Sequence, residues 1–564
     1  MKLSELKYDE KSRVYVNPEK VIDYSDGEEN EQYVLDCLRN AKDTSIFSED
    51  LLKCIKDWPS EYHFTTYRPN IVRPFNISKG QKILEIGAGT GAITRYLGET
   101  GAKVVAVEGG LPRAKCIAER CRDLENVTVI CSNVEDIEFD EKFDIITLIG
   151  VFEYTAKYSG HQDPFVDALK SYGDLLKPDG SLIIAIENKL GLKYFSGFNE
   201  DHFGQPYFGI EDRYGVKDIT TFGYEEIKDM LVDSGYGSVK FLFPFPDYKI
   251  PKTIITDKGL EHNDFNETDL IRLTKERHYG TRPKANLLNN YLAWKVIAEN
   301  KLVKDLSNSF LIVANQSGVT ELIDDSVLAE FYTCGRFQPF NTVTTFKRKR
   351  TEVEGIIVKK NLLDSKKHPE DKKGLVHTFN NQIDYISGDN LHHLVTEALF
   401  KKQFAEYENL MKQWATFAKS NLMSNDNVSK IKPEYFDALP RNMIMDKSGK
   451  VHLFDQEWTV KEPFDLSFLL VRYLAEYRRK KGIFSGYAKS FYGFVSKTSM
   501  ACGLQPLSKS EILKMMKRDE NLRGSIHRPG GIAPRKILKS FLQLILQKLK
   551  ELKAYIYFDL FAQR

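Results

Sequence analysis

The sequence predicts an α/β fold in which a parallel β-sheet is preceded by a helical cap and followed by an α+β domain and a C-terminal helix. The first observation is a rhythm between residues 82 and 186, where short apolar runs alternate with helical patterns. Such alternation is typical of βαβ units. The second observation is a glycine-rich turn from Gly87 to Gly91, which directly follows the first apolar run.

The length of the chain, 564 residues, exceeds what one core supports, because single cores stop growing at roughly 250–300 residues. Apolar residues make up 42% and charged residues 28%, which is an ordinary globular composition. We therefore expect four segments: a helical N-terminal cap over 1–60, a sheet domain over 61–316 with an insertion at about 256–308, an α+β domain over 317–490, and a helical C-terminal region over 491–564.

The charge balance argues against nucleic acid as a partner. The 81 basic and 79 acidic side chains leave a net charge of +2, which gives no global attraction for phosphates. The seven cysteines contain no Cys-x-x-Cys pair, and neither a signal peptide nor a run of about 18 apolar residues is found. The sequence thus predicts a cytoplasmic protein, with the inner face of the membrane as the alternative location.

The predicted elements follow in order along the chain. Helical patterns around Tyr33 and Leu51 form the cap. Phe241–Phe243 and Phe310–Val313 supply two strands that close the sheet. Its five central strands are expected at 83–86, 104–107, 127–130, 143–149 and 181–186.

The second half of the chain has a different pattern. Strand-like segments rich in Thr and Phe at 342–346 and 355–358 precede helices around Trp414 and Phe417. The tail from Arg535 to Phe561 repeats Leu and Ile at helical spacing with lysines between them, which predicts a basic amphipathic helix. We favour packing of this helix on its own chain or in a coiled coil, and attachment to a membrane surface is the alternative.

The glycine-rich turn predicts a binding site for an anionic or carboxylate-bearing cofactor. Alternating glycines let the backbone approach a ligand closely, and the following helix offers unpaired N–H groups. Dinucleotide-binding folds use a related turn and an acid about 20 residues later, which Glu108 would supply. Glu85, two residues before Gly87, suits a cofactor ammonium group and is poorly placed beside a pyrophosphate.

The segment from about residue 60 to residue 250 resembles the class I S-adenosylmethionine-dependent methyltransferases, whose first motif is Glu/Asp-x-Gly-x-Gly-x-Gly on a Rossmann-like sheet. The resemblance implies that Glu108 binds the ribose hydroxyls and that the loop at Asn133 contacts adenine, although the family usually has Asp where this chain has Asn133. It implies S-adenosyl-L-methionine as the cofactor. The predicted cofactor-binding residues are Glu85, Gly87, Gly89, Gly91, Glu108, Asn133, Val134 and Gly150.

Methylation of a hydroxyl requires a base, and histidine titrates nearest to neutral pH. His202, oriented by Asp201, is the first candidate for this base, and His63 is the second. Glu153, which follows the fourth strand, is expected to orient the acceptor hydroxyl or to take its proton. The alternatives are a structural or surface role for His202 and a helix N-terminal role for Glu153.

Two segments, residues 62–70 and 187–194, resemble segments of methyltransferases associated with bacterial surface-polysaccharide biosynthesis. This resemblance implies a glycan, or its lipid-linked precursor, as the acceptor. It also implies glycosyltransferases as partners.

The second half contains an Asp-x-x-x-x-Asn sequence, Asp437 to Asn442, followed by Asp455. With the predicted hairpin between them, this order resembles aminoglycoside-phosphotransferase-like kinases. The resemblance implies that Asp437 accepts a hydroxyl proton and that Asn442 and Asp455 hold the metal of Mg-ATP. Tyr435 stands where a His is usual, and no glycine-rich nucleotide loop is visible.

Three hypotheses for function follow. The leading one is an S-adenosylmethionine-dependent methyltransferase that O-methylates a bacterial surface glycan. The second is a bifunctional methyltransferase-kinase that acts on the end of a glycan chain. The third is a scaffold that binds the cofactor without turnover.

Overall fold

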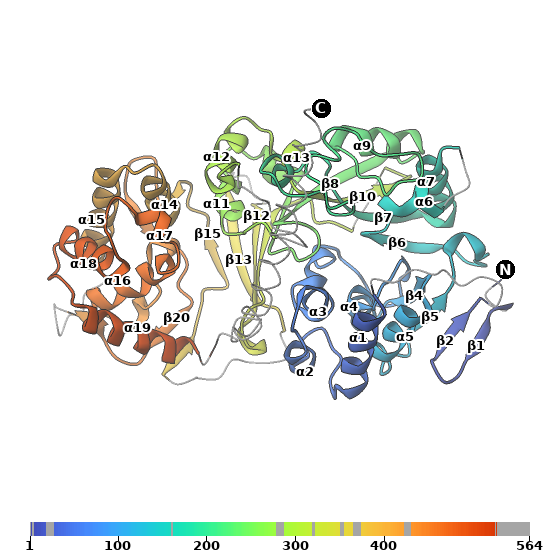
Figure 1. Ribbon diagram of the computed structural model, residues 1–564, viewed down its shortest axis with the longest axis horizontal. Coiled ribbons are helices and arrows are strands. Elements are labelled where there is room, and N and C mark those ends of the chain that lie inside the picture. The colour runs from blue at the N-terminus through green and yellow to red at the C-terminus, as the bar shows by residue number, and fades with distance from the viewer. Residues whose placement is uncertain are drawn as a thin grey trace, which may run out of the picture.

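The computed structural model describes most of the chain, namely residues 2, 5–17, 27–158, 162–277, 287–318, 322–349, 355–364, 374–421, 430–524 and 526. Figure 1 shows the N-terminal half and the helical C-terminal part at opposite ends of the molecule, with strands between them. The predicted amphipathic helix between Arg535 and Phe561 lies outside the described residues. Within the described residues, no helix is both long enough and apolar enough to cross a bilayer.

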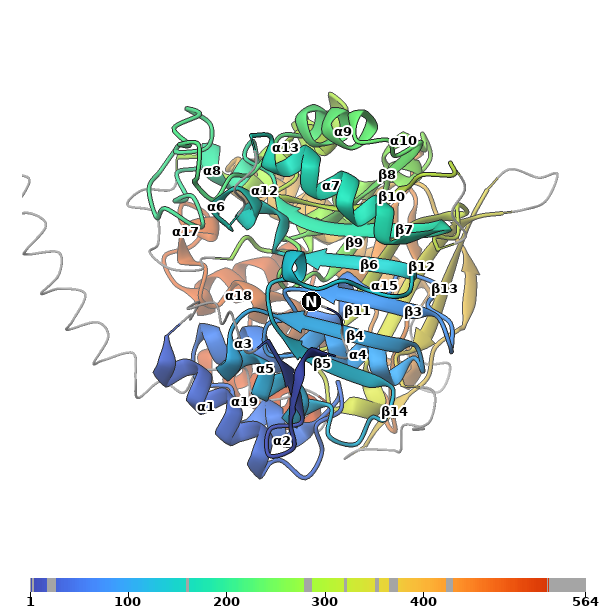
Figure 2. The same ribbon diagram turned by 90° about the vertical axis from the view of Figure 1, so that its right-hand side faces the viewer.

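The centre of the N-terminal half is a sheet of five parallel strands, as predicted. In space they run in the order β5, β4, β3, β6, β7 and lie side by side in Figure 2. The two further strands are confirmed as well: β10 lies antiparallel between β7 and β8. The strand bounds are Lys82–Ile86 for β3, Lys103–Glu108 for β4, Val127–Cys131 for β5, Phe143–Ile149 for β6, Leu176–Glu187 for β7, Ser238–Phe245 for β8 and Ser309–Asn315 for β10.

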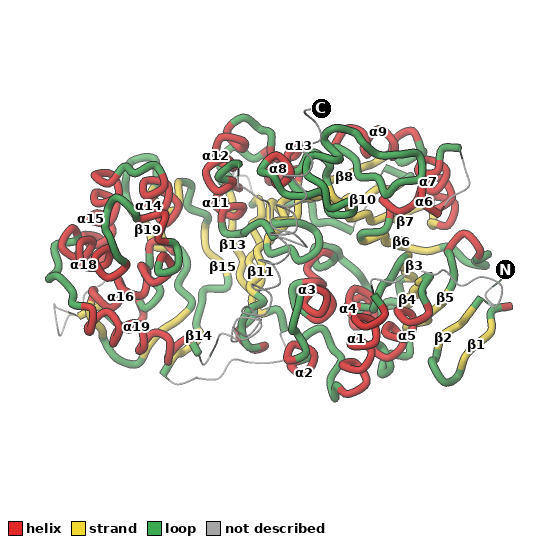
Figure 3. Tube along the Cα trace, in the orientation of Figure 1, coloured by secondary structure: helices red, strands yellow, loops and turns green. Residues whose placement is uncertain are grey.

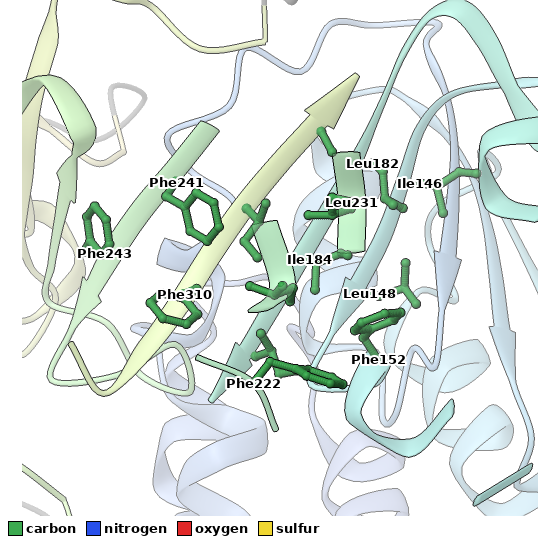
Figure 4. Packing of buried hydrophobic residues seen from close by; sticks show 14 of the residues in the cluster. Ile146, Leu148, Phe152, Leu182, Ile184, Phe222, Leu231, Phe241, Phe243 and Phe310 are labelled. Carbon is green, nitrogen blue, oxygen red and sulfur yellow. The ribbon is translucent and has the colours of Figure 1, made fainter. Parts of the chain in front are cut away.

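Helices cover both faces of this sheet, which explains why its strands are continuous apolar runs. On one face, Ile146, Leu182 and Ile184 pack towards Leu231 of α9, and Phe241 and Phe310 meet edge to face beside them (Figure 4). On the other face, the alternate strand residues pack with α4. The flanking helices are α4 (Ala92–Glu99), α5 (Leu111–Arg120), α6 (Thr155–Tyr158), α7 (Pro164–Leu175), α8 (Leu192–Phe195) and α9 (Tyr224–Asp233).

The sheet continues across residue 316, where the sequence predicts a domain boundary. β11 pairs with β9, and β12, β13 and β15 follow, all antiparallel, so that the largest sheet among the described residues has 14 strands. These added strands are β9 (Thr253–Thr256), β11 (Val327–Thr333), β12 (Thr342–Arg348), β13 (Ile356–Leu362) and β15 (Gln382–Asp384). Between β9 and β10 lie α10 (Asp257–Glu261), α11 (Glu267–Arg272), α12 (Asn290–Glu299) and α13 (Val303–Leu306).

Among the described residues, the first α-helix of the predicted N-terminal cap begins at Glu28. α1 (Glu28–Asn40) packs on α5, and α2 (Glu49–Lys53) and α3 (Trp58–Phe64) follow it. Earlier in the chain, β1 (Lys7–Asp9) and β2 (Val14–Val16) form a hairpin whose second strand pairs with the edge of β5. The hairpin replaces the expected helix because fully buried Val14 joins the small apolar cluster beneath α5.

The C-terminal part has its own apolar core and is mainly helical, as the red tube segments of Figure 3 show. Its helices are α14 (Leu391–Phe400), α15 (Phe404–Asn421), α16 (Leu466–Leu474), α17 (Lys481–Phe484), α18 (Phe491–Ala501) and α19 (Lys509–Arg523). The predicted hairpin is confirmed by β18 and β19, which pair in antiparallel fashion. The short strands are β14 (Leu375–His377), β16 (Asp389–Asn390), β17 (Lys430–Ile431), β18 (Met443–Met445), β19 (Val451–Leu453), β20 (Trp458–Val460) and β21 (Phe464–Asp465).

Candidate functional site

A cavity of about 450 Å³ opens at the carboxyl ends of the parallel strands, which is where open α/β sheets bind ligands. Its volume suits a ligand of cofactor size. Residues from the ends of β3 to β7, from the cap helices and from the loop after β8 form its wall. The predicted residues that line it are Glu85, Gly87, Gly89, Glu108, Asn133, Val134, Gly150, Glu153, His63, Asp201 and His202.

The glycine-rich turn leaves β3 and enters α4 with its glycines in left-handed backbone conformations. At Gly87 the φ angle is 67°, and a Cβ atom would come within 2.5 Å of the Val151 side chain. Gly91, by contrast, does not line the cavity. A Cβ atom there would meet the Cα of Ile117 in α5 at 3.0 Å, so Gly91 lets two helices pack closely rather than facing a ligand.

Glu108, at the end of β4, is tied to the glycine turn. Its Oε2 accepts a hydrogen bond from the Gly89 N–H at 2.8 Å, and its Oε1 accepts one from the Gly110 N–H at 3.1 Å. The residue is 4% exposed, and the nearest guanidinium nitrogen of Arg113 is 3.8 Å away. These contacts orient the carboxylate at the cavity wall, where it can accept further hydrogen bonds from a diol.

Glu85 lies in β3, two residues before Gly87, and is buried. Burial raises the pKa of its carboxyl group to about 8, against the opposing effects of Thr94 and the Arg68 guanidinium. Its Oε2 has no hydrogen-bond partner within the described part of the chain. A cationic ligand group placed beside this oxygen would therefore favour the ionised carboxylate.

The acceptor candidates lie at the ends of β6 and β7. Glu153 follows β6, Glu187 ends β7, and His202 comes from the loop after α8. The His202 Nε2 lies 3.7 Å from the Glu187 Oε2, and its Nδ1 lies 3.4 Å from the Tyr154 hydroxyl. Three residues far apart in the sequence are therefore brought to one end of the cavity.

The charges of this group perturb one another. Burial and the neighbouring Glu187 raise the pKa of Glu153 to about 8. Burial lowers the pKa of His202, but Glu187 and Glu153 outweigh it and raise that pKa to about 9. Burial also raises the pKa of Glu187, and the Lys249 ammonium outweighs this effect and holds the pKa well below its usual range.

Asp201 does not have the role that the sequence suggested. Its Oδ2 accepts hydrogen bonds from Lys193 Nζ at 2.5 Å and from the Tyr194 hydroxyl at 2.9 Å. The carboxylate facing His202 is that of Glu187. The fold brings the loop that carries His202 back to the end of β7, and this contact between distant positions has no local sequence signal. Asp201 instead anchors the loop to α8.

His63, the second candidate base, is buried beside the glycine turn. Its Nδ1 shares a hydrogen bond of 2.8 Å with the Thr90 hydroxyl. Burial lowers the pKa of His63 well below its usual range, helped by the charges of Arg113 and Arg120. The imidazole therefore stays neutral near pH 7. Its contact with Thr90 places it in the part of the cavity wall that the glycine turn forms.

Sequence reasoning missed Tyr248 and Lys249, which reach the cavity from the loop after β8. The Lys249 ammonium contacts the Glu187 Oε1, and the Tyr248 hydroxyl donates to the same oxygen at 3.3 Å. The Arg68 guanidinium fixes this loop by donating to both backbone carbonyls at 3.1 Å. No short motif links these residues to Glu187, which precedes them by about 60 positions, so only the fold identifies them.

The residues predicted to be kinase-like also lie near one another, around the hairpin of β18 and β19. The Asn442 side chain donates to the Asp437 carbonyl at 2.8 Å, and the buried Asp437 carboxylate accepts from Arg472 at 3.0 Å. Lys360 of β13 contacts the Asp455 Oδ1 at 2.5 Å. The contacts of Asn442 and Asp437 stabilise the fold around the hairpin. The contact of Asp455 instead joins this region to Lys360 in the large sheet.

Arg472 is the most consequential of these groups for stability, because it also binds the buried Asp519 at 3.0 Å. We expect Arg472→Ala to leave the buried Asp437 carboxylate without its cationic partner and Asp519 with Arg523 alone among the described residues, at a cost of about 3–5 kcal/mol. Hydrogen exchange of peptides from α16 and α19 should then quicken at least about 100-fold. The control is Arg523→Ala, which removes a 42% exposed partner of Asp519 and should change exchange only a few-fold. Equal effects of the two variants would contradict this account.

The comparisons with known proteins find methyltransferases. A family model described as a methyltransferase domain matches residues 84–184. The demethylmenaquinone methyltransferase of Tropheryma whipplei (strain Twist) is 29% identical over 119 residues, which cover 21% of this chain and 46% of that protein. The mitochondrial ubiquinone biosynthesis O-methyltransferase of Mus musculus is 33% identical over 125 residues, covering 21% and 32%. The chain thus spans less than half the length of these two relatives.

Among solved structures, a Haemonchus contortus phosphoethanolamine N-methyltransferase 2 in complex with S-adenosyl-L-methionine aligns at 18% identity. The alignment covers 44% of this chain and 51% of that chain, with a TM-score of 0.27. The family match and the curated relatives confirm the class predicted from the glycine-rich turn. The chain therefore carries a methyltransferase domain that includes residues 84–184.

Proposed function

We propose that the protein binds S-adenosylmethionine in this cavity and transfers its methyl group to a hydroxyl of an acceptor held beside Glu153 and His202. The observation that carries the proposal is the hydrogen bond from the Gly89 N–H to Glu108 at the cavity wall. It links the glycine turn to the acid that ends β4, at the ligand-binding edge of the sheet. Glu108 would accept the ribose hydroxyls, Glu85 would face the ammonium group, and the Asn133 amide would meet the adenine.

Deprotonation of the acceptor is assigned to the group formed by Glu153, Glu187 and His202. A base is needed because a neutral hydroxyl attacks the sulfonium methyl poorly. His202 is held protonated near pH 7 by the two carboxylates, so it must lose that proton before it can act. We therefore assign deprotonation to the three side chains together and not to His202 alone.

The acceptor proposed from the sequence is a glycan or its lipid-linked precursor. The polar end of the cavity supports this choice, because carboxylates and hydroxyls suit a polyol. Aromatic rings of Trp58, Tyr62 and Tyr154 line the same cavity and can pack on a sugar face. The test is mass spectrometry of methyl transfer to undecaprenyl-linked glycans and to quinone precursors, and methylation of the quinone precursors alone would overturn the glycan assignment.

The affinity for the cofactor should depend on pH through Glu85. Its pKa of about 8 means that the carboxyl group is mostly protonated at pH 6 and must lose its proton to pair with an ammonium group. We therefore expect affinity to rise about tenfold per pH unit between pH 6 and pH 7.5. In the Glu85→Gln variant this slope should vanish. Isothermal titration calorimetry at several pH values measures it, and an equal slope in both proteins would rule out Glu85 as its source.

A second candidate function is phosphoryl transfer in the C-terminal part, favoured by the contact between Lys360 and Asp455. In this proposal Asp455 and Asn442 would hold the metal of Mg-ATP. The pairing of Asp437 with Arg472 weighs against the role of Asp437 as a proton acceptor. ATP-dependent phosphorylation of the acceptor that is lost in Asp455→Ala would support this function, and its absence with every methylated acceptor would leave the methyltransferase alone.

A further inference from the structure

Glu153, Glu187 and His202 form a compact set of ligand atoms at the acceptor end of the cavity. One carboxylate oxygen from each glutamate and one imidazole nitrogen all lie within 4.8 Å of one another. Both glutamates are fully buried: Glu187 is the last residue of β7, and Glu153 lies in a short 3₁₀ helix just after the neighbouring parallel strand β6. Their positions are thus set by the sheet rather than by a flexible surface.

The ligand atoms of these three side chains that lack a hydrogen bond within the described chain lie close together at the acceptor end of the cavity. Both carboxylate oxygens of Glu153, the Glu187 Oε2 and the His202 Nε2 are buried and have no hydrogen-bond partner among the described residues. Buried polar atoms are normally satisfied, and an ionised carboxylate without a partner is costly. A cation that accepts both oxygen and nitrogen ligands would satisfy these atoms together.

The remaining atoms of the same side chains are already bound. Lys249 and Tyr248 occupy the Glu187 Oε1, and the Tyr154 hydroxyl lies next to the His202 Nδ1. Such contacts behind a ligand atom orient metal ligands in proteins, since they fix the tautomer of the histidine and the rotation of the carboxylate. The Glu187 Oε2 and the His202 Nε2 are the atoms that this arrangement leaves for a ligand.

We propose that Glu153, Glu187 and His202 bind a divalent cation. Two carboxylate oxygens and one imidazole nitrogen form a mixed set that suits ions such as Mn²⁺ or Zn²⁺. Ligands at about 2.0–2.2 Å on opposite sides of one ion lie about 4.0–4.4 Å apart, so the observed span closes onto an ion with small side-chain movements. Lys249 offsets one of the two carboxylate charges, and the other is available to a dication when His202 binds the ion as a neutral imidazole.

This inference rests on the proposed methyl transfer and deepens it. Three protein ligands leave open positions on the ion that face the cavity, and two neighbouring oxygens of an acceptor, as in a vicinal diol, can fill them. The ion lowers the pKa of the bound hydroxyl, whose proton leaves to water. The oxygen–methyl bond then forms as the sulfur–methyl bond breaks, which gives a methyl ether and S-adenosylhomocysteine.

The test is titration of the full chain, freed of metal with EDTA, with Mn²⁺ alone. Electron paramagnetic resonance of free Mn²⁺ should show one bound ion per chain. Glu153→Gln and Glu187→Gln should each weaken binding at least tenfold. The matched control is Asp446→Asn, which alters a half-buried carboxylate–histidine pair at the β18–β19 hairpin, outside the cavity lining, and should leave binding unchanged. Calorimetry with S-adenosylmethionine on every variant shows that the cavity is still folded.

Absence of stoichiometric Mn²⁺ binding by the wild-type chain would overturn the cation site, as would unchanged binding in both glutamine variants. If a glutamine variant fails to fold, His202→Ala, at the less buried corner of the set, provides the same comparison. S-adenosylmethionine binding without Mn²⁺ binding refutes the cation and spares the proposed function. Mn²⁺ binding without S-adenosylmethionine binding refutes the proposed function and leaves the cation site standing.

Discussion

Replacing Glu108 with alanine should abolish measurable binding of S-adenosylmethionine. The carboxylate would accept two hydrogen bonds from the ribose, and hydrogen bonds to charged groups contribute about 1.5–3 kcal/mol each. In the wild-type chain the same carboxylate accepts hydrogen bonds from the Gly89 and Gly110 N–H groups and so orders the turn. The variant removes both hydrogen bonds. We expect the dissociation constant measured by calorimetry to rise at least about 100-fold.

A matched control for this experiment is Glu125→Ala. Glu125 is an exposed acid in the turn just before β5, outside the cavity lining, and its loss should leave the affinity within about twofold. Circular dichroism of both variants would show that the fold is kept. Binding in Glu108→Ala as tight as in the control would exclude the cavity as the adenosyl site.

Replacing Glu153 with glutamine should stop methyl transfer while sparing the cofactor. This residue is fully buried at the end of β6, and its carboxylate oxygens face the acceptor end of the cavity. Loss of a group that deprotonates or activates the acceptor usually costs about 10²–10⁴-fold in rate. We expect kcat to fall by that amount and the affinity for S-adenosylmethionine to change less than about threefold.

The division between rate and cofactor affinity is what makes the Glu153 variant informative. A variant that merely loosened the fold would weaken cofactor binding together with turnover. Initial rates with radiolabelled S-adenosylmethionine and calorimetry on the same preparation separate the two effects. Unchanged kcat in Glu153→Gln would place the chemistry elsewhere in the cavity.

The sheet and the cofactor side of the cavity could be predicted from the sequence because both have local signals. The runs at Ile83–Ile86 and Ile145–Ile149 are apolar except for Glu85 and Thr147, as is typical of strands covered on both faces. The acid at Glu108 follows its strand directly, so spacing alone predicts its position beside the glycine turn. In each case neighbours in sequence are neighbours in the site.

The acceptor end could not be predicted in the same way, because its contacts join distant segments. Asp201 precedes His202 in sequence, yet the carboxylate facing that imidazole belongs to Glu187. Lys249 reaches Glu187 only because β8 returns beside β10 at the same edge of the sheet. The N-terminal hairpin was missed for a similar reason: strands of three residues carry too little periodicity to identify, and β2 is stabilised by pairing with β5.

The measurement that tests the central claim most directly is a calorimetric titration of the full chain with S-adenosylmethionine and, in parallel, with NAD. The glycine turn and Glu108 are compatible with either cofactor in their spacing, whereas buried Glu85 favours the one that carries an ammonium group. We predict saturable binding of one S-adenosylmethionine per chain and no binding of NAD. Binding of NAD, or of neither compound, would contradict the account.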